Sequence, residues 1–189
     1  INGACADEFL TPESAAICAR ERAAGRAPVT MANAERAILA RLRAMREEDF
    51  APFDGGGEGL YHRLYDAVQR ETTIDGILAA AKSKRYAYAR LRRLLLAAYL
   101  GVTPEDIPQR VPYLRVLACN ERGREVLRCM KTTAAAPVLT RSADVRRLDA
   151  GAQRLFALTA RAEEQYVLAY PDLAAARPGS AWTTDPVIL

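Results

Sequence analysis

Six basic residues and no acidic residue lie between Lys82 and Arg93, and this segment holds the strongest candidates for chemistry in the sequence. Ammonium and guanidinium groups donate charge-assisted hydrogen bonds to phosphate oxygens, and an aromatic ring among them can stack on a base. The segment therefore predicts RNA binding. The candidate RNA-binding residues are Arg63, Lys82, Lys84, Arg85, Tyr86, Arg90 and Arg93.

These candidates have separate expected roles. Ser83 is expected to cap a helix that ends at Gly101, with Lys84 and Arg85 in its first turn. The positive end of the helix dipole disfavours cations there unless an anion binds. We expect Arg85, Arg90 and Arg93 to bind phosphates on the face opposite the leucines. Lys82 and Lys84 would attract the RNA, and Tyr86 would stack or brace.

The alternative is that these cations are ordinary solvent-exposed surface residues that bind no ligand. Only three of the 27 basic residues are lysines, a bias that a GC-rich genome also produces. Position along the chain argues against this alternative, because the positive charge is concentrated. A second concentration, from Arg110 to Lys131, holds six cations and two acids. Charge focused in this way is typical of a surface that meets a polyanion.

The sequence lacks the residue patterns of nucleotidyl transfer, of a phosphate-binding loop and of a zinc site. His62 is the only histidine, so the paired histidines of an HxGH nucleotidyl transfer motif are missing. Gly55-Gly56-Gly57 is not followed by the Lys-Ser/Thr of a phosphate-binding loop. The cysteines Cys5, Cys18, Cys119 and Cys129 form no CxxC pair, which argues against zinc. We therefore expect no catalytic residue, no cofactor and no metal within this chain.

The composition is ordinary for a globular protein, and contact with neither a membrane nor DNA is expected. Half of its 189 residues are apolar, its net charge is +4 and its pI is about 9.0. The apolar run Leu94–Leu100 is far shorter than the roughly 18 residues of a membrane span. Cysteines without a pairing pattern indicate a reducing compartment, so a cytoplasmic location is expected. A first residue Ile1 suggests a piece of a longer protein.

The pattern of apolar residues, caps and breakers predicts a mainly α multi-helix domain with a small two-strand β element. The strands are expected at 113–117 and 137–140, on either side of a helix capped by Asn120, and the tail from Arg177 is expected to be irregular. A Gly-rich connector around 50–57 separates two parts, 1–50 and 58–189. The expected helices are 11–25, 30–46, 58–70, 73–81, 83–101, 120–130 and 149–170.

Three blocks in this order resemble a known family. They are the segments Glu58–Arg63, Lys82–Arg93 and Tyr113–Arg124, and the ending Thr183-Thr184-Asp185-Pro186 is also similar. They resemble the C-terminal half of the bacterial tRNA(Met) cytidine acetate ligases. Ala87 departs from the family pattern, in which a threonine is expected after the Lys-Arg-Tyr element.

The resemblance implies an ATP-dependent enzyme that forms N4-acetylcytidine at the wobble position of tRNA(Met). It also implies that ATP and the nucleotidyltransferase domain belong to an N-terminal part outside this chain. This chain would then be the C-terminal tRNA-binding portion, with tRNA and that separate domain as its partners. The alternative is a helical scaffold that positions or dimerises a catalytic partner without contacting RNA. The whole protein would be an enzyme, and this part alone would not.

Overall fold

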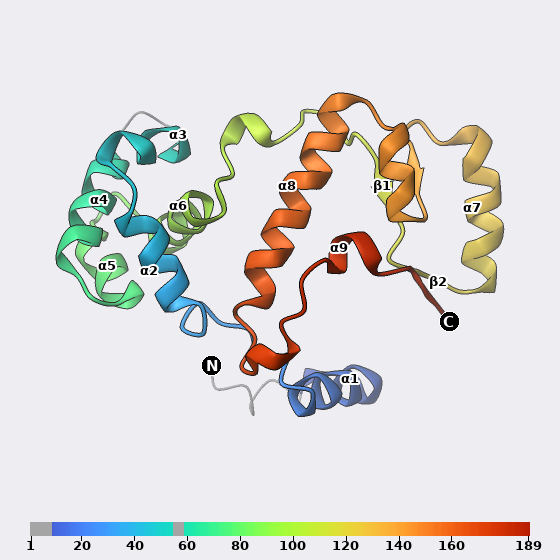
Figure 1. The fold of residues 1–189 in the computed structure, drawn as a ribbon, viewed down its shortest axis with the longest axis horizontal. Coiled ribbons are helices and arrows are strands. Elements are labelled where there is room, and N and C mark those ends of the chain that lie inside the picture. The colour runs from blue at the N-terminus through green and yellow to red at the C-terminus, as the bar shows by residue number, and fades with distance from the viewer. Residues whose placement is uncertain (1–8, 55–58) are drawn as a thin grey trace. The chain divides into compact units, whose positions relative to one another are not determined.

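The computed structural model describes residues 9–54 and 59–189, and these form two compact units. The first unit runs to Pro104 and includes Gln165–Pro178, and the second comprises Glu105–Glu164 and Gly179–Leu189. Figure 1 shows helices through most of the chain, so the mainly α prediction is confirmed. The predicted connector at 50–57 lies in the first unit, and its residues 55–57 are outside the described ranges.

The core of the first unit is formed by helices α2 (Glu35–Arg43), α4 (Leu60–Arg70), α5 (Ile74–Ala81) and α6 (Tyr88–Leu100). Each helix places apolar residues three or four positions apart, so one stripe faces its neighbours. The predicted stripe of α4 is confirmed, because all four of its residues are buried. The buried residues of α4 are Leu60, Leu64, Ala67 and Val68.

Two helix starts in this unit are confirmed by their caps. The hydroxyl of Thr11 accepts a hydrogen bond from the amide of Ser14 at the start of α1 (Pro12–Ala23). The hydroxyl of Thr73 accepts a hydrogen bond from the amide of Gly76 at the start of α5. The predicted start at Thr30 is wrong. Its hydroxyl accepts from the amide of Asn33 within a turn, and α2 begins only at Glu35.

The start of α6 also differs from the prediction, whereas its end does not. Gly101 ends the helix with a φ of 69°, a left-handed conformation that suits glycine. The helix begins at Tyr88, because the ring of Tyr86 is buried and its amide donates to the hydroxyl of Ser83 in a bend. Lys84 and Arg85 therefore lie in a loop, and Tyr86 shares no helix face with Arg90.

In the second unit the predicted strand, helix and strand are confirmed. Strand β1 (Leu114–Arg115) pairs in parallel with β3 (Val138–Leu139), and α7 (Glu121–Thr133) lies between them in sequence. Asn120 caps α7 by accepting a hydrogen bond from the amide of Gly123.

The expectation of an irregular tail is wrong. The tail forms α9 (Ser180–Thr183) and β4 (Val187–Ile188), and β4 pairs in parallel with β2 (Ala118–Cys119). The amide of Val187 donates to the carbonyl of Leu117, which fixes this register. The chain is therefore not purely α-helical.

The long helix α8 (Ala150–Val167) carries the core of the second unit. Asp149 accepts a hydrogen bond from the amide of Ala152, so the predicted cap is confirmed. Ala152, Phe156 and Ala160 recur every four residues along α8 and are buried. They pack with Leu139, Val145, Leu148 and Ala181. Among the helices of the described residues, none has the length and apolar composition needed to cross a membrane.

Candidate nucleic-acid interface

The predicted RNA-binding cations gather around the loop that joins α5 to α6. Lys82, Lys84 and Arg85 belong to this loop and are exposed. Arg93 is exposed on α6, one turn beyond the half-buried Arg90. Because the loop and the first turns of α6 are continuous, these cations share one region of the first unit.

Tyr86 anchors the loop. Its ring is only 4% exposed, with the guanidinium carbons of Arg85 and Arg90 at 5.7 and 5.4 Å from the ring centre. Such cation–π contacts contribute about 0.5–1 kcal/mol at partly exposed sites. Of the two roles expected for Tyr86, this burial favours bracing over stacking on a base.

Arg63 and Tyr88 support the same loop from two helices. The Nε of Arg63 in α4 donates to the carbonyl of Ala81, the residue just before Lys82, at 3.3 Å. The Nζ of Lys82 lies 4.9 Å from the centre of the Tyr88 ring. Arg63 therefore positions the start of the loop, and Tyr88 is a contact that the sequence did not indicate.

Asp54 is a second residue that the sequence did not indicate, and its carboxylate is nearly buried. Oδ2 accepts hydrogen bonds from the amides of Leu60 and Tyr61, at 3.0 and 3.4 Å, and so caps α4. Oδ1 lies 3.7 Å from the guanidinium of Arg90 and has no hydrogen bond within the described parts. The sequence offered one signal for this role, because an acidic residue just before a Gly-rich stretch and a helix can cap that helix.

His62 takes part in no arrangement that resembles a phosphate-binding pair. Its Nδ1 lies 2.5 Å from Oε1 of Glu47, and its ring lies against Tyr61 with 3.9 Å between ring centres. It is the only histidine of the sequence, so this chain lacks the paired histidines of an HxGH motif. No group of three metal-binding side chains occurs in the described ranges.

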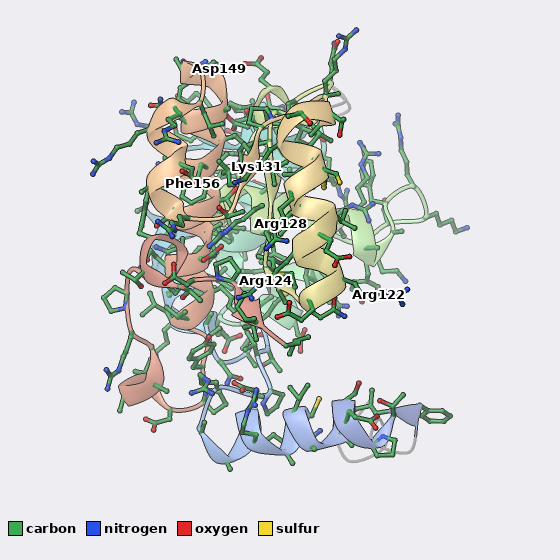
Figure 2. All side chains as sticks on the ribbon, turned by 90° about the vertical axis from the view of Figure 1, so that its right-hand side faces the viewer. Arg122, Arg124, Arg128, Lys131, Asp149 and Phe156 are labelled. Carbon is green, nitrogen blue, oxygen red and sulfur yellow. The ribbon has the colours of Figure 1, made fainter. Side chains whose placement is uncertain are left out.

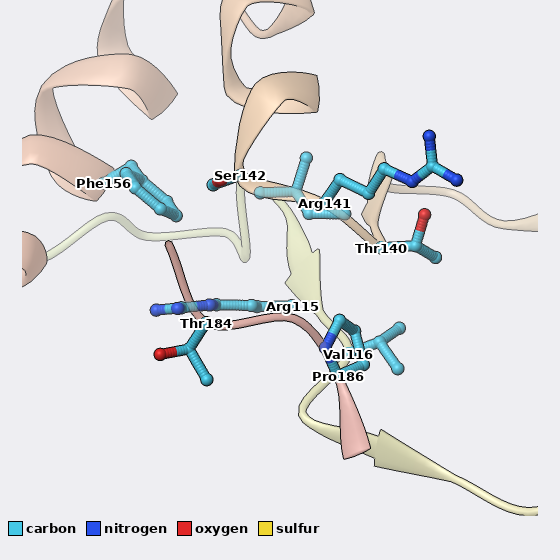
Figure 3. A pocket seen from close by; sticks show the side chains of 9 residues that line it. Arg115, Val116, Thr140, Arg141, Ser142, Phe156, Thr184 and Pro186 are labelled. Carbon is cyan, nitrogen blue, oxygen red and sulfur yellow. The ribbon is translucent and has the colours of Figure 1, made fainter. Parts of the chain in front are cut away.

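The second unit has a small pocket beside β1 and β3 (Figure 3). Arg115 points towards Phe156, with 5.3 Å from its guanidinium carbon to the ring centre. It also donates to Glu163 at 3.1 Å and to the carbonyl of Ala181 at 3.0 Å. The pocket of about 10 Å³ has room for about one water molecule. The contacts of Arg115 with Glu163, Ala181 and Phe156 give this residue a structural role.

A wider groove on the same unit has room for a small ligand. Its volume is about 600 Å³, within the usual range for ligand sites. Arg141 and Thr140 can donate to phosphate, while Asp185 adds one negative charge. The rest of the lining is apolar apart from the thiol of Cys119, and its apolar residues are Val116, Leu127, Pro186 and Ile188. The groove thus combines hydrogen-bond donors, one carboxylate and apolar side chains.

Comparison with known proteins identifies relatives along nearly the whole chain. The family model described as HIGH Nucleotidyl Transferase matches residues 3–179. The tRNA(Met) cytidine acetate ligase of Syntrophomonas wolfei is 27% identical over 187 residues, covering 94% of this chain and 45% of that protein. The ligase of Kosmotoga olearia is 37% identical over 131 residues, covering 67% and 31%. The chain spans less than half the length of these relatives.

Two crystal structures of Thermotoga maritima TmcAL have the same fold as this chain. Each superposes with a TM-score of 0.89 and 25% sequence identity over 95% of the chain. This chain covers 46% of the apo structure and 47% of the structure with alpha-thio ATP bound.

The family match corrects three predictions. The chain is not a C-terminal portion outside the nucleotidyltransferase region, because the model of that family matches residues 3–179. A separate nucleotidyltransferase domain as its partner is unsupported for the same reason. The expectation of no cofactor in this chain is also wrong, because the matched family is one of nucleotidyl transferases and a similar structure holds alpha-thio ATP. The chain belongs to the HIGH nucleotidyl transferase family.

Proposed function

We propose that this chain works in an ATP-dependent ligase that modifies tRNA, and that the chain itself binds both ATP and tRNA. The curated relatives are tRNA(Met) cytidine acetate ligases, and a similar structure holds alpha-thio ATP. The reaction then joins acetate to a cytidine of tRNA(Met), and ATP supplies the free energy for this step. The family match along most of the chain supports the nucleotide part of this proposal.

The proposal that the chain binds RNA rests on one observation. Cations of the loop at residues 82–86 and of α6 are exposed, and the loop is held in place by a buried side chain. Lys82, Lys84, Arg85 and Arg93 are exposed, whereas Tyr86 is buried beneath the guanidinium groups of Arg85 and Arg90. A buried anchor reduces the entropy lost when the loop binds its ligand. Contacts with phosphates also release counterions from the RNA, which makes the binding dependent on salt.

We propose the groove of the second unit as the ATP site. The guanidinium of Arg141 and the hydroxyl of Thr140 would hold phosphate oxygens. Val116, Leu127 and Ile188 would cover the purine. In this arrangement the residues of this chain bind and orient the nucleotide, and the apolar wall excludes water from one side.

The RNA part is tested by titrating the purified chain into labelled tRNA(Met). A DNA duplex with the same number of phosphates serves as the competitor. We expect the chain to bind tRNA and the duplex to compete weakly. Absence of tRNA binding, or equal competition by the duplex, would contradict RNA recognition by this chain.

The ATP part is tested by equilibrium dialysis with labelled ATP. Arg141→Gln should weaken binding about tenfold, the equivalent of one charged hydrogen bond. Arg146→Gln removes an exposed charge outside the groove lining and serves as the control. Undetectable binding by the wild-type chain would refute ATP binding, and equal affinity of the two variants would refute the groove as its site.

A further inference from the structure

Helix α7 (Glu121–Thr133) has no residue that is buried, although it is 13 residues long. Val126 is 57% exposed, and Leu127 and Met130 are only partly covered. A helix normally owes most of its stability to an apolar face packed on the core. The surface of α7 is therefore open to a partner over most of its length.

Three cations form a stripe along this helix, which we call the α7 basic face. Arg124, Arg128 and Lys131 stand at i, i+4 and i+7, and all three are exposed. Figure 2 shows them on one side of α7, with Arg122 on another. The Nη1 of Arg124 lies 3.2 Å from Oε1 of Glu121. Because Glu121 is largely exposed, this pair is weak and can give way to a phosphate.

The helix dipole favours only part of this stripe. A cation in the last turn, such as Lys131, interacts favourably with the helix dipole, but one near the first turn, such as Arg124, does not. Arg124 and Arg128 also repel each other, because like charges four residues apart destabilise a helix. Glu121 lies three residues before Arg124 and Glu125 three residues before Arg128, so these acids offset part of the repulsion, and a bound anion would neutralise the rest.

We infer that the α7 basic face is a second contact for the phosphate backbone of RNA. From Arg124 to Lys131 the helix rises about 10 Å. Each cation of such a stripe can donate to a phosphate oxygen, and each contact releases counterions from the RNA. Leu127, between Arg124 and Lys131 in sequence, lines the groove that also contains Arg141 and Asp185.

This inference rests on the proposed function, because it assumes that the chain binds tRNA. Its test is tRNA affinity across a salt series for the full chain and for Arg124→Gln/Arg128→Gln/Lys131→Gln. The control, Arg146→Gln/Arg154→Gln/Arg161→Gln, removes the same charge from exposed positions of the same unit. Glutamine favours helix, and circular dichroism verifies that both variants fold.

The α7 variant should bind tRNA at least about tenfold more weakly than the control. We call the slope of the logarithm of tRNA affinity against the logarithm of salt concentration the salt slope. Its magnitude should fall by about 0.7–0.9 for each phosphate that the variant no longer neutralises. Arg124→Lys/Arg128→Lys, which keeps the charge, should retain most of the affinity.

Equal affinity and slope for the α7 variant and the control, with a wild type that binds tRNA, would overturn the inference and leave the proposed function intact. No binding by the wild type would overturn both. Weaker binding of polyglutamate by the variant, with tRNA affinity unchanged, would assign the face to an acidic protein and also overturn the inference.

Discussion

The carboxylate of Asp54 lies 3.7 Å from the guanidinium of Arg90, and its side chain is only 2% exposed. Its other oxygen accepts hydrogen bonds from the first amides of α4. Asp54 therefore ties the start of α4 to Arg90 of α6, and Arg90 in turn lies over the ring of Tyr86. A predicted phosphate ligand is thus also a structural residue.

Arg90→Gln should lower the free energy of unfolding by about 2–4 kcal/mol, because it leaves the Asp54 carboxylate buried without its countercharge. The measurement is urea unfolding followed by circular dichroism. Arg93→Gln removes the same charge from an exposed position of the same helix and should cost less than about 0.5 kcal/mol. Equal losses for the two variants would mean that the contact with Asp54 contributes nothing to stability.

Leu94→Ala should lower the free energy of unfolding by about 2–5 kcal/mol, because it opens a cavity among buried side chains. Leu94 is 4% exposed on the face of α6 that joins the core of the first unit. Ile17→Ala on α1, where the side chain is half exposed, should cost less than about 1 kcal/mol. A loss of under about 0.5 kcal/mol for Leu94→Ala would show that this face is not packed.

Burial raises the pKa of the Tyr99 hydroxyl above its ordinary value of about 10. The neutral side chain is therefore favoured in the folded state, where its hydroxyl donates to Gln165 at 2.7 Å. The neutral Tyr99 hydroxyl contributes fully to the free energy of unfolding below about pH 10. This contribution is lost as the pH rises towards the pKa of the folded state. Urea unfolding from pH 8 to 11 measures it.

Tyr99→Phe should be less stable than the wild type by about 1 kcal/mol at pH 8, and the difference should shrink above pH 10. Tyr88→Phe on the exposed start of α6 is the control. A difference between wild type and Tyr99→Phe that stays constant to pH 11 would contradict the role assigned to burial.

Local signals predicted much of the fold. The caps at Thr11, Thr73, Asn120 and Asp149 and the stop at Gly101 are all present, because each depends on residues within one turn. The start of α6 was missed because it depends on tertiary burial. Ser83 has the chemistry of a helix cap, but burying Tyr86 moves the helix start to Tyr88.

Long-range pairing limited the prediction of strands and of the candidate site. Strand β4 lies nearly 70 residues after its partner β2, and each is two residues long, too short for a periodic pattern. Asp54 meets Arg90 only because α3 (Ala51–Asp54) and α6 come together in the fold. The concentration of charge at residues 82–93 was visible in the sequence, and bracing was one of the two roles predicted for Tyr86. The hydrogen bond from Arg63 to the carbonyl of Ala81 was not visible, because it joins two different helices.

The salt dependence of tRNA(Met) binding by Lys84→Gln/Arg85→Gln/Arg93→Gln tests the RNA-binding claim most directly. Arg90 is left unchanged because its loss would destabilise the fold, and Arg20→Gln/Arg22→Gln/Arg36→Gln is the control at exposed positions of the first unit. The first variant should bind at least about tenfold more weakly, with a salt slope lower by about 0.7–0.9 for each phosphate left without its cation. If both variants bind with the same affinity and slope as the wild type, the cations around the loop are solvated surface and RNA binds elsewhere or not at all.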